Sequence, residues 1–272
     1  MIVMAEVTLT PKGEIGIMVE AEVIIPDTFA KKSTSEIGDL LVWQGPKERP
    51  LSDFFDVDGE GGETAEETAI VINGDVSRVK RIGNGMTAGK ITINGSAGMH
   101  VGSEMSGGEI TVNGDANAWA GMEMKGGLLH ITGNAKDHAG CAYRGSWHGM
   151  SGGRLVIDGD ADSQVGGGMS GGEIEVLGSV QNFCGIRQNG GLIVIRGDCV
   201  RGVGAEMNGG TIVVGGAITN FLAGFEQAGS ESDLAFDGVS CPGEFLKFSG
   251  DNAIIAWTKG TLYASKSANE GL

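Results

Sequence analysis

The sequence predicts an all-β fold, a parallel β-helix (solenoid) of about eight 19-residue turns, and three observations support this prediction. A 19-residue phrase recurs head to tail: KITINGSAGMHVGSEMSGG begins at Lys90 and EITVNGDANAWAGMEMKGG at Glu109. Each copy contains an alternating apolar run, which is typical of a strand. Thirty-eight of the fifty glycines but none of the five prolines lie between residues 69 and 229. This distribution suits glycine corners joined by strands whose N–H groups all donate to a neighbour.

The array has eight units and defines three regions of the chain. A degenerate copy begins at Ala69, a copy with seven extra residues begins at Leu128, and the closing copy begins at Thr211. Nineteen residues is too short for a propeller blade, and no unit shows the 3.6-residue spacing of a helix. Because an open β-coil exposes backbone at both ends, we expect an N-terminal cap with an acidic linker (residues 1–68), the β-helix (69–229) and a C-terminal cap (230–272).

Equivalent positions of stacked turns form columns, so the sequence can be compared column by column. One column is uniformly small and apolar and is expected to face inward: Val101, Ala120, Ala139, Val165, Cys184 and Val203. A second should fill narrow corners with flexible thioethers: Met86, Met105, Met124, Met150, Met169, Gln188 and Met207. A third holds large rings and, by alternation, should point outward: His100, Trp119, His138, Gln164, Phe183 and Gly202. Such rings are either covered by a flanking segment or contact a partner, and the sequence leaves both alternatives open.

One insertion interrupts the array, the seven extra residues of the fourth copy within 141–149. Solenoids tolerate insertions at their corners, where function is often placed. The insertion is rich in aromatic and arginine side chains, the types enriched at interface hot spots. We therefore predict a partner-contact surface made of Trp119, His138, Tyr143, Arg144, Trp147 and His148. Variation without a function is the alternative for the insertion.

The sequence offers no candidate for chemistry in this chain. Its glycine spacings do not lie between a strand and a helix, so they do not indicate a dinucleotide or phosphate loop. The four histidines do not converge, and no carboxylate pair or nucleophile with a base stands out. Three aspartates at unit corners are expected to form turns: Asp115, Asp160 and Asp198. We expect no catalytic, cofactor-binding or metal-binding residue, and four reduced, structural cysteines.

Charge and hydropathy limit the partners and the location. The formal net charge of −16 argues against nucleic acid or an anionic membrane as partner, since both need a cationic surface. No run of about 18 apolar residues and no signal-peptide pattern is present. We therefore expect a cytoplasmic protein.

A longer pattern connects the array to a known family. Seven copies of a 13-residue phrase, [Gly/Trp]-x-x-Met-x-x-Gly-x-[Ile/Leu]-x-[Ile/Val]-x-Gly, run in register over residues 83–216, with Trp147 opening the fourth copy and Gln188 replacing Met in the sixth. This pattern closely resembles the C subunit of formylmethanofuran dehydrogenases, the tungsten or molybdenum enzymes of methanogenic archaea. The likeness extends to YRGSWHGMSGG and PGEFLKFSGD. A more distant likeness is to the C-terminal glycine-repeat domain of the glutamate synthase large subunit, which implies a right-handed β-helix.

The resemblance implies a role that the repeats alone do not show. The family's complex reduces CO2 to formate at a pterin-bound tungsten or molybdenum site and condenses formate with methanofuran at a binuclear metal site, giving N-formylmethanofuran. These centres and the iron–sulfur clusters belong to other subunits. The resemblance therefore implies a non-catalytic scaffold with those subunits as its partners. A similar subunit of the formyltransferase/hydrolase complex of methylotrophic bacteria, or a glutamate-synthase-type domain, are the alternatives.

Overall fold

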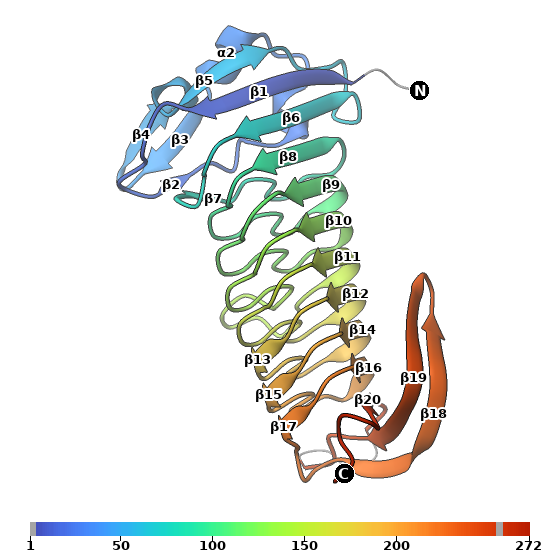
Figure 1. Ribbon diagram of the computed structural model, residues 1–272. Helices are drawn as coiled ribbons and strands as arrows, with labels where there is room; N and C mark the ends of the chain where they lie inside the picture. The colour runs from blue at the N-terminus through green and yellow to red at the C-terminus, as the bar shows by residue number, and fades with distance from the viewer. Residues whose placement is uncertain (1–3, 254–257) are drawn as a thin grey trace.

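The computed structural model describes residues 4–253 and 258–272, and it forms a rod of β-strands connected by turns and loops (Figure 1). The all-β prediction is confirmed, since the helices among these described residues are confined to α1 (Pro26–Phe29), α2 (Thr34–Gly38) and a 3-10 turn at Leu51–Asp53. Residues 1–3 and 254–257, which belong to the two predicted caps, lie outside the described residues.

Each predicted repeat supplies one strand to a 13-stranded sheet, and neighbouring repeats pair in parallel. The register follows the repeat, because Lys90 lies opposite Glu109 and Leu192 opposite Thr211, whereas Leu128 lies opposite Arg154 across the longer copy. The sheet is mixed, because antiparallel strands flank the parallel ones at both ends. The eight repeat strands are β6 (Thr68–Asn73), β8 (Lys90–Asn94), β9 (Ser106–Val112), β10 (Gly126–Ile131), β11 (Ser151–Ile157), β12 (Ser170–Val176), β14 (Asn189–Ile195) and β16 (Gly209–Val214).

A second wall of the rod carries two smaller sheets, one at each end. They are connected by single parallel bridges between equivalent alanine and valine positions of successive turns. The N-terminal sheet has the order β4 (Lys47–Pro50), β3 (Leu41–Gln44), β2 (Val19–Glu20) and β7 (Val79–Lys80). The C-terminal sheet contains β13 (Val180–Asn182), β15 (Cys199–Arg201) and β17 (Ile218–Asn220).

The core is a continuous stack of apolar columns inside the rod. The alternating strand residues, such as Ile91 and Ile93, are fully buried, and so is the small column that includes Ala120 and Cys184. Burial raises the pKa of the Cys184 thiol to about 12, so this cysteine is a packing residue. The four cysteines of the chain are buried free thiols.

The methionine column explains why each phrase ends in Met-x-Gly-Gly. Met105 is fully buried, and a Cβ added at Gly127 of the next turn would lie 2.7 Å from its Cε. Gly127 has φ of +80°, a conformation that favours glycine. In the sixth copy Gln188 takes the place of methionine, and its Nε2 donates to the carbonyls of Gly190 and Gly191 at 3.1 Å. The predicted corner-filling role of this column is therefore confirmed.

The corner aspartates act between turns, which differs from the local turn-forming role expected from the sequence. Asp115 Oδ1 accepts a hydrogen bond from the backbone N of Asn134 in the next turn at 2.7 Å. Asp160 and Asp198 accept equivalent bonds from Ser179 N and Ala217 N, also at 2.7 Å. Since every turn offers an N–H at this corner, a carboxylate oxygen one strand spacing away is well placed to accept it.

The N-terminal segment covers the first turn of the rod. β1 (Ala5–Pro11) pairs in parallel with β6, and β5 (Phe55–Gly59) pairs antiparallel with β1. The helix α1 has proline in its first turn, and α2 begins with a capping box of Ser33 and Glu36. Phe29 and Phe55, both fully buried, pack into the main core from this end, so the segment covers this end of the rod.

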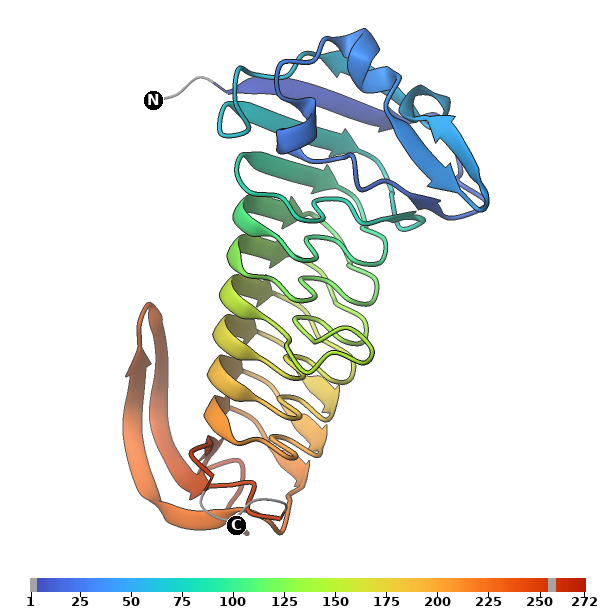
Figure 2. The ribbon, with the colours of Figure 1, turned by 180° about the vertical axis from the view of Figure 1, so that it is seen from behind.

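The C-terminal segment extends the sheet and then folds back along the rod. β20 (Thr261–Ser265) pairs in parallel with β16, and β19 (Val239–Ser249) and β18 (Glu226–Phe236) follow as an antiparallel hairpin. The hairpin packs on the outer face of the sheet through a second apolar cluster that includes Val194, Val213 and Phe245. Figures 1 and 2 show this hairpin on one side of the rod and β2, β3 and β4 on the other.

Candidate partner interface

The ring column is not exposed in the way that alternation predicted. Its residues have left-handed backbone, with φ of 64° at His100 and 70° at Trp119 and His138. Their rings therefore stack on one another, with centroids 6.0 Å apart for His100 and Trp119 and 4.1 Å apart for Trp119 and His138. Trp119 is only 6% exposed. The rings lie outside the apolar core, as alternation predicted, but Trp119 and His100 are covered, which is one of the two alternatives that the sequence left open.

The covering element is the insertion itself rather than a terminal segment. The Tyr143 ring is tilted by 56° against Trp119, with the centroids 5.9 Å apart. The backbone N of Tyr143 donates to Glu123 Oε1 at 3.0 Å, which ties the insertion to the preceding turn. Tyr143 remains 49% exposed, so it covers the stack and still presents an aromatic surface.

Both histidines of the stack are neutral at neutral pH. Burial lowers the pKa of His100 to about 4, and the charges of Arg81 and Lys80 act in the same direction. Burial also lowers the pKa of His138. Neither buried Nδ1 atom has a hydrogen-bond partner among the described residues. The stack is therefore an uncharged aromatic platform beneath the insertion.

The insertion brings the six predicted contact residues together on one side of the rod. Five of them line a hollow of about 170 Å³, and His148 lines an adjoining hollow of about 410 Å³ that shares Trp147. Trp147 is 70% exposed, and Arg144 and His148 are exposed as well. We call this surface the insertion patch; it consists of Trp119, His138, Tyr143, Arg144, Trp147 and His148.

One residue of this surface was missed by the sequence analysis. The Arg187 guanidinium lies 4.9 Å from the centroid of the Trp147 ring and pairs with Glu206 at 2.7 Å. Arg187 therefore packs against the exposed indole in a cation–π contact. The sequence contained a signal for it, because Arg187 occupies the column of Glu104, Glu123 and Glu206 and directly precedes the one glutamine of the methionine column.

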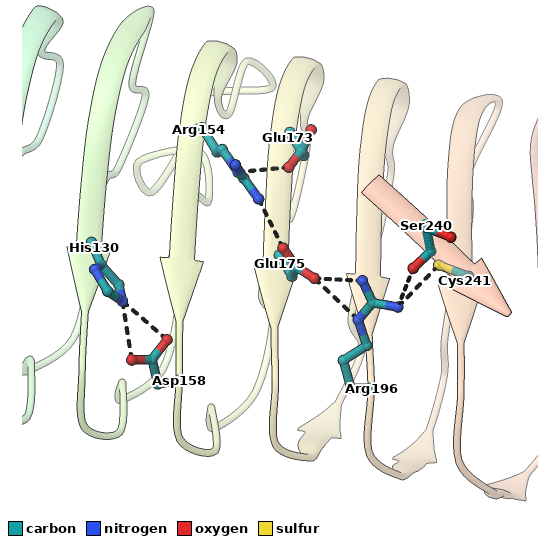
Figure 3. Close-up of polar contacts among 8 residues, drawn as sticks. All are labelled: His130, Arg154, Asp158, Glu173, Glu175, Arg196, Ser240 and Cys241. Carbon is teal, nitrogen blue, oxygen red and sulfur yellow. Dashed lines mark hydrogen bonds and ion pairs between the residues drawn. The ribbon is translucent and has the colours of Figure 1, made fainter. Parts of the chain in front are cut away.

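A polar network on the outer face of the large sheet is the other candidate for chemistry (Figure 3). Glu175, which is buried, contacts Arg154 at 2.9 Å and Arg196 at 2.6 Å. Arg196 then donates to the carbonyl of Ser240 in the hairpin at 2.8 Å and contacts Cys241 Sγ at 3.3 Å. This chain of contacts attaches the hairpin to the sheet, and we assign it a structural role.

The His130–Asp158 pair lies on the same face without a group on which it could act. His130 Nε2 lies 3.0 Å from both carboxylate oxygens of Asp158. Within residues 4–253 and 258–272, no three His, Cys, Asp or Glu side chains converge as a metal site requires. None of the helices in that part of the chain is both long enough and apolar enough to span a lipid bilayer.

Comparison with known proteins places the chain in a family. No protein-family model matches it. It is 62% identical to the C subunit of the tungsten-containing formylmethanofuran dehydrogenase 2 of Methanothermobacter thermautotrophicus over 266 residues, covering 98% of both chains. A 98-residue part is 64% identical to the C subunit of the molybdenum-containing formylmethanofuran dehydrogenase 1 of Methanosarcina barkeri, covering 36% of this chain and 33% of that relative.

A solved structure resembles the whole fold. A chain of the formyltransferase/hydrolase complex (FhcABCD) from Methylorubrum extorquens, determined in complex with methylofuran, superposes with a TM-score of 0.84 at 30% identity, covering 95% of this chain and 99% of that chain. The resemblance inferred from the repeats is thus confirmed by 62% sequence identity over nearly the full length of both chains. The chain belongs to the family of formylmethanofuran dehydrogenase C subunits.

Proposed function

We propose that this chain is the scaffold subunit of a formylmethanofuran dehydrogenase complex, which reduces CO2 and condenses formate with methanofuran. The 62% identity over 98% of both chains to the C subunit of a tungsten-containing enzyme carries this proposal. Purification of the native protein tests it. Co-purification with subunits that hold a tungsten or molybdenum pterin is the expected result, and an active monomer would refute it.

In this proposal the chain contributes surface and rigidity, and other subunits carry the metal centres and iron–sulfur clusters. The polar groups that do meet on the described surface, such as Glu175 and Arg196, hold the hairpin in place. They do not provide the ligand set of a metal centre. We therefore derive no reaction step through residues of this chain.

We further propose that the rod is a right-handed parallel β-helix with the predicted division into residues 1–68, 69–229 and 230–272. Parallel pairing at the repeat spacing supports the coil. Its stacked turns would keep docking sites at fixed distances, about 4.8 Å per turn. β18 crosses the predicted boundary at residue 229, so the closing copy and the C-terminal cap share a strand. The cytoplasmic location stays a prediction.

The insertion patch is the proposed partner contact. Trp147 combines high exposure with a fixed orientation on Arg187, and rigid, partly exposed aromatic residues are frequent hot spots. We predict that Trp147→Ala weakens association with the other subunits by tenfold or more, about 1.4 kcal/mol. The thermal unfolding of the variant should stay unchanged, because the indole fills no core space.

Leu177→Ala is the matched control for this substitution. Leu177 is 45% exposed beyond the end of β12, outside the insertion patch. Measured by native mass spectrometry of the purified complex, the leucine variant should retain its partners. Full assembly of the Trp147→Ala complex would remove the insertion from the interface.

The second candidate function is the same scaffold in a formyltransferase/hydrolase complex. The full-length structural likeness to the Methylorubrum extorquens chain supports it, although the identity is only 30%. Purification also separates the two candidates. A formyltransferase partner without a pterin cofactor would favour the second, whereas a metal–pterin subunit favours the first.

A further inference from the structure

We propose that the interface continues onto the N-terminal sheet, so that a single folded partner subunit docks along this entire side of the rod. The added contact is the N-terminal patch, which consists of Ile17, Leu41 and Trp43. This inference rests on the proposed function, in which the insertion patch already contacts a partner.

The N-terminal patch consists of exposed apolar side chains on two neighbouring segments. Ile17 is 65% exposed, Leu41 52% and Trp43 48%. Val42, between the latter two, is buried, so Leu41 and Trp43 share the outward face of β3. The side-chain amide of Gln44 donates to the Ile17 carbonyl at 3.3 Å, which joins the two segments. Leu41 and Trp43, which share one face of β3, therefore mark a candidate contact site.

A hollow lies beside Trp43 in this patch. It measures about 600 Å³ and is bordered by Glu20, Glu22 and Lys80 as well as the indole. Lys80 pairs with Glu20 at 3.0 Å, and Arg81 pairs with Glu22 at 3.3 Å. The indole therefore stands beside a polar recess that a protruding side chain of a partner can enter.

The ring column connects the N-terminal patch to the insertion patch. Trp43 lies opposite Glu20 in the sheet, and Glu20 lies opposite Lys80. The next residue, Arg81, has φ of 65° and donates its backbone N–H to the carbonyl of Met99 at 2.9 Å, so it is the first member of the left-handed column. The charges of Arg81, Lys80 and Glu20 all act on His100, the next member.

Both patches lie on the same side of the rod. Figures 1 and 2 show β2, β3 and β4 on the side that also carries the yellow-green insertion, and the β18–β19 hairpin on the opposite side. Five turns separate Arg81 from Phe183, the column member in the same repeat as Arg187. At about 4.8 Å per turn, the distance between these two positions along the rod is about 24 Å. A standard interface of about 800 Å² per partner is on the order of 28 Å across. One folded protein can therefore cover both indoles, whereas a small ligand cannot.

Charge indicates what the partner presents at each end. Beside Trp43 the charges are already paired, since Glu20 and Glu22 contact Lys80 and Arg81. On the insertion, Arg144 is exposed and has no ion-pair partner among the described residues. The partner surface should therefore carry apolar groups facing the N-terminal patch and a carboxylate facing Arg144. Such a charge pattern favours one orientation of docking.

Site-specific photo-cross-linking in the complete complex tests the inference. A photoreactive phenylalanine replaces Trp43 in one preparation, Trp147 in a second and Ser230 in a third, and the captured subunit is identified by mass spectrometry. Ser230 is exposed on β18, in the hairpin on the opposite side of the rod. We expect positions 43 and 147 to capture the same subunit and position 230 not to capture it. Capture of a different subunit, of a second copy of this chain or of nothing at position 43 overturns the inference. Capture of that subunit at position 230 as well overturns the one-sided assignment.

The same experiment separates this inference from the proposed function. If position 147 captures no subunit, the proposed contact at the insertion fails. If position 147 captures a subunit and position 43 does not, only the N-terminal extension fails. As a second measurement, Trp43→Ala should weaken retention of the captured subunit at least tenfold in the purified complex. Unchanged retention would contradict the inference, because an exposed indole on this edge would then contribute nothing to binding.

Discussion

The close stacking of turns at the Met-x-Gly-Gly corner makes a quantitative prediction for Gly153→Ala. Gly153 has φ of +80°, and an added Cβ would lie 2.7 Å from the carbonyl carbon of Gly126 and 2.8 Å from both Gly127 O and Met124 Cε. Left-handed backbone costs a non-glycine residue about 1–2 kcal/mol. Overpacking against backbone adds about 1–3 kcal/mol. We therefore expect the free energy of unfolding to fall by about 2–5 kcal/mol.

Gly145→Ala is the matched control, because it keeps the cost of a left-handed backbone and removes the cost of overpacking. Gly145 has φ of +87°, and no atom lies within 4 Å of its added Cβ. Its substitution should therefore cost only about 1–2 kcal/mol. Urea unfolding followed by circular dichroism gives both values. Equal effects of the two substitutions would refute the argument that Gly153 is required by the approach of the neighbouring turn.

Three further predictions concern polar groups. Burial lowers the pKa of His100 from 6.5 to about 4, so the folded protein holds this histidine neutral. Below pH 6.5 the unfolded chain binds a proton at His100 that the folded protein does not bind, so stability is complete above pH 6.5 and is lost as the pH falls toward 4. Urea unfolding should show a loss of about 2 kcal/mol between pH 7 and pH 5 that His100→Gln abolishes; an unchanged pH slope would contradict this. Gln188→Met should raise the free energy of unfolding by about 1 kcal/mol, since Gln188 Oε1 is buried and unpartnered among the described residues, and a lower stability would count against it. Asp160→Ala should lower the free energy of unfolding by about 1 kcal/mol, because Ser179 N loses its acceptor. The control Asp162→Ala, which removes only the surface ion pair with Lys136, should lower it by less than about 0.5 kcal/mol. Similar thermal shifts of the two variants would contradict a stabilising role for the aspartate hydrogen bonds between turns.

The sequence predicted the repeat strands and the core because both depend on local patterns. Alternation around Ile91 and Ile93 gives the strand, and the regular spacing of copies gives the parallel register. The small column and the methionine column were predicted for the same reason, since equivalent residues of stacked turns must share an environment. The six predicted contact residues also lie together, and Trp147 is the most exposed large apolar side chain among those described.

The covering of the ring column could not be predicted from alternation. Trp119 lies outside the apolar core, as the pattern predicts, but its ring stacks on His138 and lies against Tyr143. Its left-handed backbone, with φ of 70°, was not expected either. Backbone conformation at a non-glycine residue depends on the hydrogen bonds of the turns above and below it. His100 N and Trp119 N both donate to carbonyls of the following repeat, and these contacts exist only once the repeats are stacked.

The sequence by itself determined the family, the repeat strands and the buried columns, since each copy repeats the same local constraints. Only the tertiary structure decided which surfaces are covered. It placed Tyr143 over Trp119, brought Arg187 beneath Trp147, folded the hairpin onto Val194 and left Trp43 exposed. These contacts join residues far apart in the chain, and their formation depends on the packing of whole segments, so no local pattern contains them.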